Sequence, residues 1–339
     1  MLIPQLHVTT RNCFVALAGM IVAVFLGFSA PAAAGPQSTP KAEFVTLGTG
    51  GGPIVRLRRS QPANALVIGD DVYLFDAGDG VQRQLRAANL ALANVRAIFI
   101  SHHHLDHDAG LGPLLAARWL FNAYRPLPVI GPPGTGEMLA RLSEAYRPVE
   151  LAPITIGGPA KPSIASTIAG RDLRPDMDQP TLVYEDEHVR ILAVTNAHYH
   201  FPPGEAARVS RSYSFRIEAG GRSIVYTGDT GWSDNVVRLA QGADILVTEV
   251  IDMTAIEAAL RRAPDLPPAA LGPMLAHMVQ DHLTPDQIGR LAAAAHVGRV
   301  VLTHLAPGND DEADSHGYTT GISVHFRGPV TVASDLDRF

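Results

Sequence analysis

The chain has 339 residues, of which 46% are hydrophobic and 18% are charged, and its formal net charge at pH 7 is −6. This composition is that of an ordinary folded protein and excludes a chain that is disordered throughout. The acidic balance argues against broad nucleic-acid binding, which depends mainly on Lys and Arg side chains that neutralise phosphates. We therefore expect a small-molecule substrate and no nucleic acid as a partner.

The first 34 residues differ from the rest of the chain. They contain one Arg and no Asp, Glu or Lys, and an apolar run from Cys13 to Phe28 is followed by small residues up to Ala34. These features predict a secretory signal peptide cleaved near Ala34, which would make the protein exported and periplasmic. A retained membrane anchor is the alternative, because roughly 17 apolar residues can span a bilayer.

Removal of this segment would change the chemistry of the chain very little. The mature protein would lose its only cysteine, Cys13, so it could form no disulfide, and its net charge would be −7. No stable membrane insertion is expected after cleavage. In this interpretation residues 35–42 are a short polar tail, and residues 43–339 form a single domain.

The first half of that domain is expected to begin with strands and to continue with alternating helices and strands. A strand at 43–47 runs into the Gly-rich turn 48–53, which lacks the Gly-Lys-Ser/Thr ending of a phosphate loop. We interpret it as a tight turn that lets the backbone approach a site. The further expected elements are a hairpin of strands at 65–68 and 72–75, a helix at 81–88, a strand at 97–100, a helix at 111–124, a strand at 127–130 and a helix at 134–146.

Residues 147–181 contain many Pro, Gly and small polar residues and predict a long loop or flap. The elements expected after it are strands at 181–184, 189–195, 212–217 and 223–226, a helix at 235–241, a strand at 244–250, two Ala/Leu-rich helices, and strands at 300–305 and 330–333. Each half thus begins with consecutive strands and then alternates. That order favours an α/β sandwich of two sheets with helices outside over a doubly wound parallel sheet.

The most informative string is Ser-His-His-His-Leu-Asp-His-Asp at 101–108, which follows a buried apolar strand. Imidazole nitrogens and carboxylate oxygens are ligands of zinc and related cations. Four candidate ligands lie within six residues and can serve two neighbouring ions: His102, His104, Asp106 and His107. The alternative is an exposed polar loop that binds metal by accident, but such a loop would not need to follow an apolar strand.

Three further candidate ligands stand where an apolar strand ends, namely His198, Asp229 and His304. Side chains at strand ends can converge on one edge of a sandwich, which provides a rigid platform for a site. Asp229 could instead be an ordinary turn residue before Thr230.

In these motifs the chain resembles the metallo-β-lactamase superfamily. The matching features are His-x-His-x-Asp-His at 102–107, Gly-Asp-Thr at 228–230, the strand-end His198 and His304, Asp76 in Phe-Asp-Ala-Gly, and the early Leu-Gly-Thr-Gly turn. Together they span nearly all of residues 43–336. The resemblance implies a four-layer αββα sandwich with the site on one edge.

The resemblance also implies ligands for two divalent cations. It assigns His102, His104 and His198 to the first ion, Asp106, His107 and His304 to the second ion, and Asp229 to a bridging position. His200 is the alternative to His198 as a ligand of the first ion, because the segment 196–200 contains both histidines. Zinc is the expected metal, although such ligands also accept iron, manganese or cobalt.

Within the superfamily the chain resembles the tRNase Z-like and arylsulfatase-like branch. The residues that carry this resemblance are Thr248-Glu249 after a strand and His-Leu-Thr-Pro at 282–285, which opens a helix at 286–295. In that branch a His at the position of His282 lies at the substrate and is oriented by a Glu like Glu249, which implies a proton donor or oxyanion clamp. The alternative for His282 is a helix-start residue, with Thr284 as the N-cap.

The chain also departs from parts of the superfamily. No long basic, Gly-rich arm for tRNA is evident, so a tRNA nuclease is not expected. True metallo-β-lactamases lack the carboxylate at the place of Asp229, and redox relatives with two irons carry Glu where this chain has His104. These departures disfavour β-lactam cleavage and oxygen chemistry.

The expected reaction is hydrolysis of an ester, either a phosphodiester or a sulfate ester, by a hydroxide held between the two ions. Asp106 would be essential for turnover, and His282 would protonate the leaving group. A lactone or other acyl compound, including a β-lactam, is the alternative substrate, and a non-catalytic periplasmic metal-binding protein is the alternative function. The flap at 147–181 and the loop at 201–211 are expected to determine the substrate.

Overall fold

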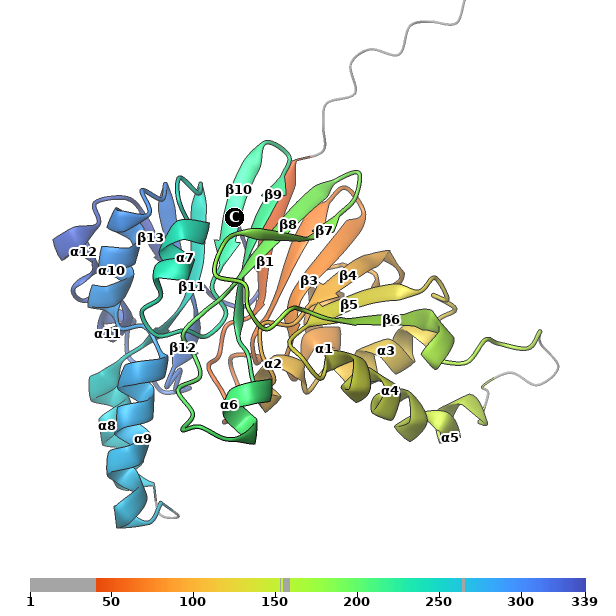
Figure 1. Ribbon diagram of the computed structural model, residues 1–339, viewed down its shortest axis with the longest axis horizontal. Coiled ribbons are helices and arrows are strands. Elements are labelled where there is room, and N and C mark those ends of the chain that lie inside the picture. The colour runs from red at the N-terminus through yellow and green to blue at the C-terminus, as the bar shows by residue number, and fades with distance from the viewer. Residues whose placement is uncertain (1–40, 153, 155–158, 264–265) are drawn as a thin grey trace, which may run out of the picture. The chain divides into compact units, whose positions relative to one another are not determined.

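The computed structural model describes residues 41–152, 154, 159–263 and 266–339. The predicted signal peptide and the tail up to residue 40 lie outside the described residues. The described residues belong to one compact unit, and Figure 1 shows its two sheets with helices on their outer sides. In this part of the chain, no helix combines the length and the apolar character needed to cross a membrane.

The first sheet contains seven strands in the order β14-β1-β2-β3-β4-β5-β6. Strands β1 to β3 pair antiparallel, β3 to β6 pair parallel, and β14 pairs antiparallel with β1. The bounds of these strands are β1 Ala42–Gly48, β2 Ala63–Ile68, β3 Asp71–Ala77, β4 Val95–Phe99, β5 Leu127–Gly131, β6 Ile168–Asp172 and β14 Asp337–Arg338.

The second sheet has a similar arrangement, with seven strands in the order β13-β12-β11-β10-β9-β8-β7. Strands β7 to β10 pair antiparallel, and β10 to β13 pair parallel. The bounds are β7 Thr181–Glu185, β8 Val189–Thr195, β9 Tyr213–Ala219, β10 Arg222–Tyr226, β11 Ile245–Ile251, β12 Arg299–Ala306 and β13 Val330–Val332.

The helices alternate with these strands along the chain. Their bounds are α1 Val81–Ala87, α2 Leu105–Asp108, α3 Leu111–Leu120, α4 Thr135–Ala145, α5 Arg147–Glu150, α6 Glu205–Val209, α7 Asp234–Leu239, α8 Met253–Arg262, α9 Pro268–Asp281, α10 Pro285–Ala294, α11 His316–Thr319 and α12 Ile322–His325. Two short 3₁₀ turns lie at Leu92–Asn94 and Ala165–Thr167.

The central core lies between the two sheets and is rich in aromatic side chains. Phe75 and Phe99 of the first sheet stack with ring centroids 5.1 Å apart, and Phe215 of the second sheet lies 6.0 Å from Phe75. On β9 the alternate residues Tyr213, Phe215 and Ile217 belong to this core. That spacing is the period of two that places every second side chain of a strand on the same face.

Helices cover the outer face of each sheet. Leu85 of α1 and Leu139 of α4 pack in a cluster on the outer side of the first sheet. Leu239 of α7 and Leu291 of α10 do the same on the second sheet. The four layers confirm the predicted αββα sandwich.

The segment 147–181 differs from the prediction of a long loop or flap. Residues 168–172 form β6, which pairs with β5 at the edge of the first sheet, and short helical turns lie at 147–150 and 165–167. All of β6 except the half-buried Ile168 is exposed. An exposed edge strand has no apolar alternation, so the usual sequence signal of a strand is missing.

Helices α8 and α9 pack against each other, and Figure 1 shows the pair extending away from the two sheets. No residue of α8 is buried, and Asp281 is the only buried residue of α9 among those described. Helix α9 ends immediately before His282, so this lightly packed pair reaches the edge of the sandwich where the candidate ligands gather.

Candidate metal centre

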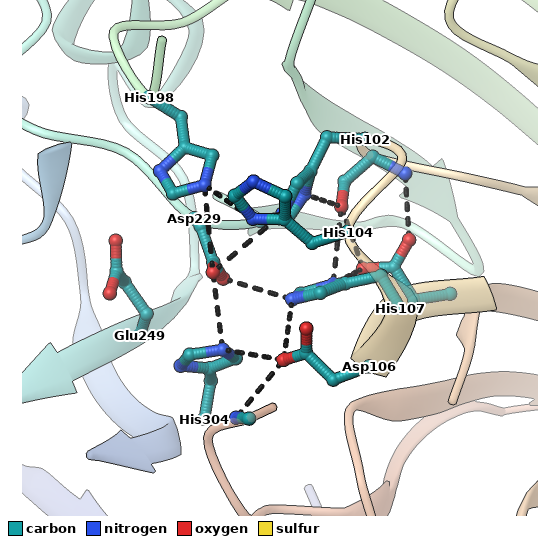
Figure 2. A network of polar contacts seen from close by, with 12 residues as sticks. His102, His104, Asp106, His107, His198, Asp229, Glu249 and His304 are labelled. Atoms are coloured by element: carbon teal, nitrogen blue, oxygen red, sulfur yellow. Dashed lines mark hydrogen bonds and ion pairs between the residues drawn. The ribbon is translucent and has the colours of Figure 1, made fainter. Parts of the chain in front are cut away.

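The candidate ligands come from the loop before α2, from α2 itself, from the loops that follow β8 and β10, and from β12, and Figure 2 shows them gathered around one centre. Their ligand atoms form two groups, and within each group these atoms lie within 4.8 Å of one another. The first group contains His102, His104, His198 and Asp229; the second contains Asp106, His107 and His304. Of these residues only His104 is not fully buried.

The first group is centred on His104. Its Nδ1 atom lies 3.1 Å from the Nε2 atoms of both His102 and His198. Asp229 Oδ2 is 3.8 Å from His102 Nε2 and 4.0 Å from His198 Nε2. Ligands that each stand about 2.0 Å from one tetrahedral cation are separated by roughly 3.3 Å, so these spacings suit one ion.

Asp229 also contacts two residues of the second group. Its Oδ2 atom lies 3.1 Å from His304 Nε2, and its Oδ1 atom lies 3.3 Å from His107 Nε2. Asp106 Oδ2 stands 3.4 Å from His304 Nε2 and 3.5 Å from His107 Nε2. A carboxylate in contact with both groups is the arrangement that a bridging ligand needs.

The chemistry of these atoms fits a bound cation. The Nε2 atoms of His107 and His304 and the Oδ1 atom of Asp229 are buried and have no hydrogen-bond partner. A buried polar atom without a partner costs about 1–3 kcal/mol. Three such atoms that face one another are best explained by an ion that binds all of them.

Hydrogen bonds orient the imidazole rings. His107 Nδ1 donates to Asp76 Oδ2 at 2.7 Å, and His198 Nδ1 donates to the carbonyl of Asp281 at 2.8 Å. In both rings Nε2 is therefore left free for a metal, the usual arrangement of metal-binding histidines. Asp76 has a positive φ of 63° and also accepts hydrogen bonds from Ser101 and Tyr226.

The Gly-rich turn approaches the site as the sequence predicts. The backbone N–H of Gly52 donates to Asp106 Oδ2 at 3.0 Å. A Cβ atom at residue 52 would lie 2.2 Å from Asp106 Cγ, so no other residue fits without movement of the carboxylate.

The two groups differ in electrostatics. Burial lowers the pKa of His102 and of His198, which favours the neutral imidazole that binds a metal. Burial opposes the charge on His304 too, but the carboxylates of Asp229 and Asp106 outweigh it and raise its pKa to about 10. The carboxylates thus favour positive charge in the second group, which is the property that a cation site requires.

His282 and Glu249 form a buried pair beside these groups. His282 Nδ1 contacts Glu249 Oε2 at 2.6 Å, and Glu249 Oε1 accepts the backbone N–H of Thr230 at 2.6 Å. Burial lowers the pKa of His282, but the adjacent Glu249 carboxylate outweighs it, so the net shift of the pKa is upward. Thr284 caps α10 with a full capping box, so the helix start is provided by Thr284 and leaves His282 free.

A cavity of about 540 Å³ opens onto the site. Four candidate ligands line it, namely His104, Asp106, Asp229 and His304, together with His282 and one face of α9. Of the residues that the structure describes in the segments 147–181 and 201–211, none lines it. One face of α9 forms part of the cavity wall instead, and the expectation that those two segments determine the substrate stays a prediction.

The structure brings His198, and not His200, into the first group. His200 instead contacts the carboxylate of Asp281, which also receives Nδ1 of His277. The reading of the sequence missed His277 and Asp281. Their spacing of four residues in an Ala/Leu-rich helix that ends at His282 is the signal that could have revealed them.

Comparisons with known proteins agree with this geometry. A family model described as "Beta-lactamase superfamily domain" matches residues 72–305. The chain belongs to the metallo-β-lactamase superfamily. It is 30% identical over 306 residues to Ribonuclease Z from Mycolicibacterium gilvum, a match that covers 87% of this chain and 95% of that protein. The resemblance to the tRNase Z-like branch is thereby confirmed.

Solved structures of this superfamily have the same fold. The metallo-β-lactamase fold protein YhfI from Bacillus subtilis has a TM-score of 0.61 and 21% identity, covering 89% of this chain and 99% of that one. Human tRNase Z, short form, has a TM-score of 0.61 and 22% identity, covering 88% and 98%. With its buried His and Asp groups, the chain is a metal-dependent hydrolase of the metallo-β-lactamase fold that acts on ester bonds.

Proposed function

We propose that this metallo-hydrolase is an exported, dinuclear zinc phosphodiesterase that acts on a small diester. The observation that carries the proposal is Asp229, whose two carboxylate oxygens face both groups of candidate ligands. A carboxylate shared in this way can bind two neighbouring ions. Two-metal sites stabilise both the attacking and the leaving oxygen when a phosphate ester is hydrolysed.

The ligand assignment follows the two groups. His102, His104 and His198 would hold the first ion, Asp106, His107 and His304 would hold the second, and Asp229 stands close enough to both groups to serve as the shared ligand. A set of five histidines and two carboxylates without thiolate suits zinc, and it also suits manganese or iron. When bound, two such ions supply Lewis acidity, which activates water and stabilises the negative charge that develops on the ester.

The chain's own residues supply orientation and a proton. Because Nδ1 of His282 is held by Glu249, its Nε2 atom is the one available to the cavity that His282 lines. A histidine placed in this way can donate its Nε2 proton to the oxygen of the departing alcohol. Glu249 is a positioning residue that keeps the ring in this orientation.

The nature of the cavity supports a small substrate. The family relatives carry the name Ribonuclease Z, yet among the described residues that line this cavity none is Lys or Arg. Binding of RNA depends on basic side chains along the phosphate backbone. A diester with one negative charge needs only the two cations for charge compensation.

Assays of the purified chain with measured zinc content would test the proposal. We expect hydrolysis of bis(p-nitrophenyl) phosphate that is faster than that of an aryl sulfate, a lactone or a cephalosporin, and no processing of a precursor tRNA. Asp106→Ala should abolish turnover. The matched control is Asp108→Asn, because Asp108 contacts His103 outside both ligand groups.

Two results would refute parts of the proposal. Full activity of Asp106→Ala would exclude the metal centre, whereas an inactive, fully metal-loaded chain would favour a metal-binding protein. Export is tested separately by mass spectrometry of the protein isolated from its native host. The expected N-terminus is Gly35, and an intact N-terminus in the cytoplasm would contradict export.

A further inference from the structure

One face of α9 forms a wall of the cavity above the candidate metal centre. The residues that line it are Ala270, Pro273, Met274, His277 and Met278. Their spacing of three and four residues is that of side chains on a single helix face. Asp281 follows on the same helix face one turn beyond His277, where it is buried beside the candidate ligand His198.

Apart from His277, the α9 residues that form this wall are apolar. Met274 and Met278 are half-buried, and the exposed Leu105 at the start of α2 lines the same cavity. Methionine side chains are flexible and polarisable, and they adapt to apolar groups of different shape. The opposite side of the cavity is formed by the polar ligand groups. A molecule that fills the cavity would therefore meet the proposed cations on one side and apolar side chains on the other.

His277 is the polar residue of the wall. Its Nδ1 atom is held by Asp281 one turn below, so Nε2 is free toward the cavity. Its ring centroid lies 5.7 Å from that of His282 and 6.2 Å from that of His198. His277 therefore stands next to both the proposed proton donor and a proposed metal ligand.

We infer that α9 forms a specificity subsite for an apolar arm of the diester, with Met274 and Met278 in contact with this arm and His277 in hydrogen-bond contact with an ester oxygen. The inference rests on the proposed function and narrows its substrate class to small diesters with an aryl or branched alkyl group. The cavity volume of about 540 Å³ lies within the range of small-molecule sites.

The test compares two diesters with the same leaving group and charge, phenyl p-nitrophenyl phosphate and methyl p-nitrophenyl phosphate. Burial of the phenyl group should raise kcat/KM by roughly 10- to 100-fold over the methyl probe. The double variant Met274→Ala and Met278→Ala should lose most of this preference and change kcat/KM for the methyl probe by less than about threefold. The matched control is Val279→Ala, since Val279 lies on α9 but is exposed and outside the cavity.

His277→Gln should lower kcat/KM for both probes by a similar factor of about 5 to 10, because one hydrogen bond is lost while the apolar wall remains. Zinc content and the thermal midpoint should stay those of the wild type. A change in zinc content together with the lost activity would instead assign His277 a structural role and overturn its part in the subsite.

A binding measurement separates this inference from the proposed function. Calorimetric titration should show tighter binding of diphenyl phosphate than of dimethyl phosphate to the wild-type chain, and similar weak binding of both to the double variant. If neither probe is hydrolysed but this binding preference holds, the proposed function fails and the subsite stands. Equal affinities in the wild type, or an equal loss in Val279→Ala, would overturn the subsite.

Discussion

The three consecutive histidines at 102–104 show how strongly position determines the role of a side chain. His102 and His104 point into the first ligand group. His103 turns the other way, with Nδ1 3.1 Å from Asp108 and Nε2 3.2 Å from Thr135 Oγ1. Because neighbouring residues of an extended segment point to opposite sides, only alternate residues of the run can share an ion.

This difference gives a prediction for metal content. His104→Gln should lower zinc affinity by more than the roughly 10- to 100-fold that loss of a ligand's hydrogen-bond partner costs. His103→Gln should leave zinc affinity unchanged. Both values can be measured by competition with a chromophoric chelator, and a loss of zinc in His103→Gln equal to that in His104→Gln would contradict the assignment.

A second prediction concerns His282. If its role is to protonate the leaving group, His282→Gln should lower kcat by about 10²- to 10⁴-fold for a diester with an alkoxide leaving group. The effect should be small for p-nitrophenolate, which departs without a proton. The measurement is the ratio of the two rates in the wild type and the variant, with zinc content as the control. Equal losses for both leaving groups would point to a binding role.

At the scale of residues, the sequence predicts which side chains gather at the site, because metal chemistry favours a few residue types. The choice between His198 and His200 required the structure, because the two histidines are only two residues apart in one short segment. The structure places Asp229 in a buried position among the ligand groups, which favours a role there over that of an exposed turn residue. Asp281 and His277 belong to no motif of the superfamily, and their only signal in the sequence is a spacing of four residues in a helix that ends at His282.

Among the elements, the apolar strands and the helices were predictable, including the two Ala/Leu-rich helices, and strand β6 was not. Strand β6 is exposed at a sheet edge. A strand of this kind is defined by its pairing with a neighbour instead of by its own periodicity. Helix α9 was expected, but its position beside the cavity was not, because that position depends on tertiary packing.

The light packing of α8 and α9 predicts local opening. Pro273 lies inside α9 and lacks an N–H group, so one hydrogen bond of the helix is missing. In hydrogen-exchange mass spectrometry, amides of α8 and α9 should exchange faster than those of β11 and β12, because opening free energies follow burial. Diphenyl phosphate should slow the exchange of α9. Exchange of α9 as slow as that of β12 would contradict this prediction.

For the molecule as a whole, the order of strands and helices was enough to predict the sandwich, because two sheets with apolar faces have few ways to bury them. The aromatic residues of β3, β4 and β9 form the layer between the sheets. The candidate metal centre takes His102 to His107 from the first half of the chain and His198 to His304 from the second half. Metal binding therefore depends on correct association of both halves.

Removal of metal should consequently destabilise the whole fold. The ligand groups place Asp106 and Asp229 close together beside buried imidazoles, and a ligand that binds only the folded state stabilises it by mass action. Treatment with a chelator should lower the thermal midpoint by roughly 5 °C or more. Differential scanning calorimetry would measure this change, and zinc should restore the midpoint. An unchanged midpoint after complete removal of zinc would contradict a dinuclear centre at this edge.

Asp281 joins the wall of the cavity to the metal centre. Its carbonyl holds His198, while its carboxylate holds both His277 and His200. A displacement of the C-terminal end of α9 would therefore move the imidazole of His198, a candidate ligand of the first group. Substitutions that displace Asp281 itself should therefore change metal affinity together with substrate preference, unlike substitutions of the side chains further up the cavity wall.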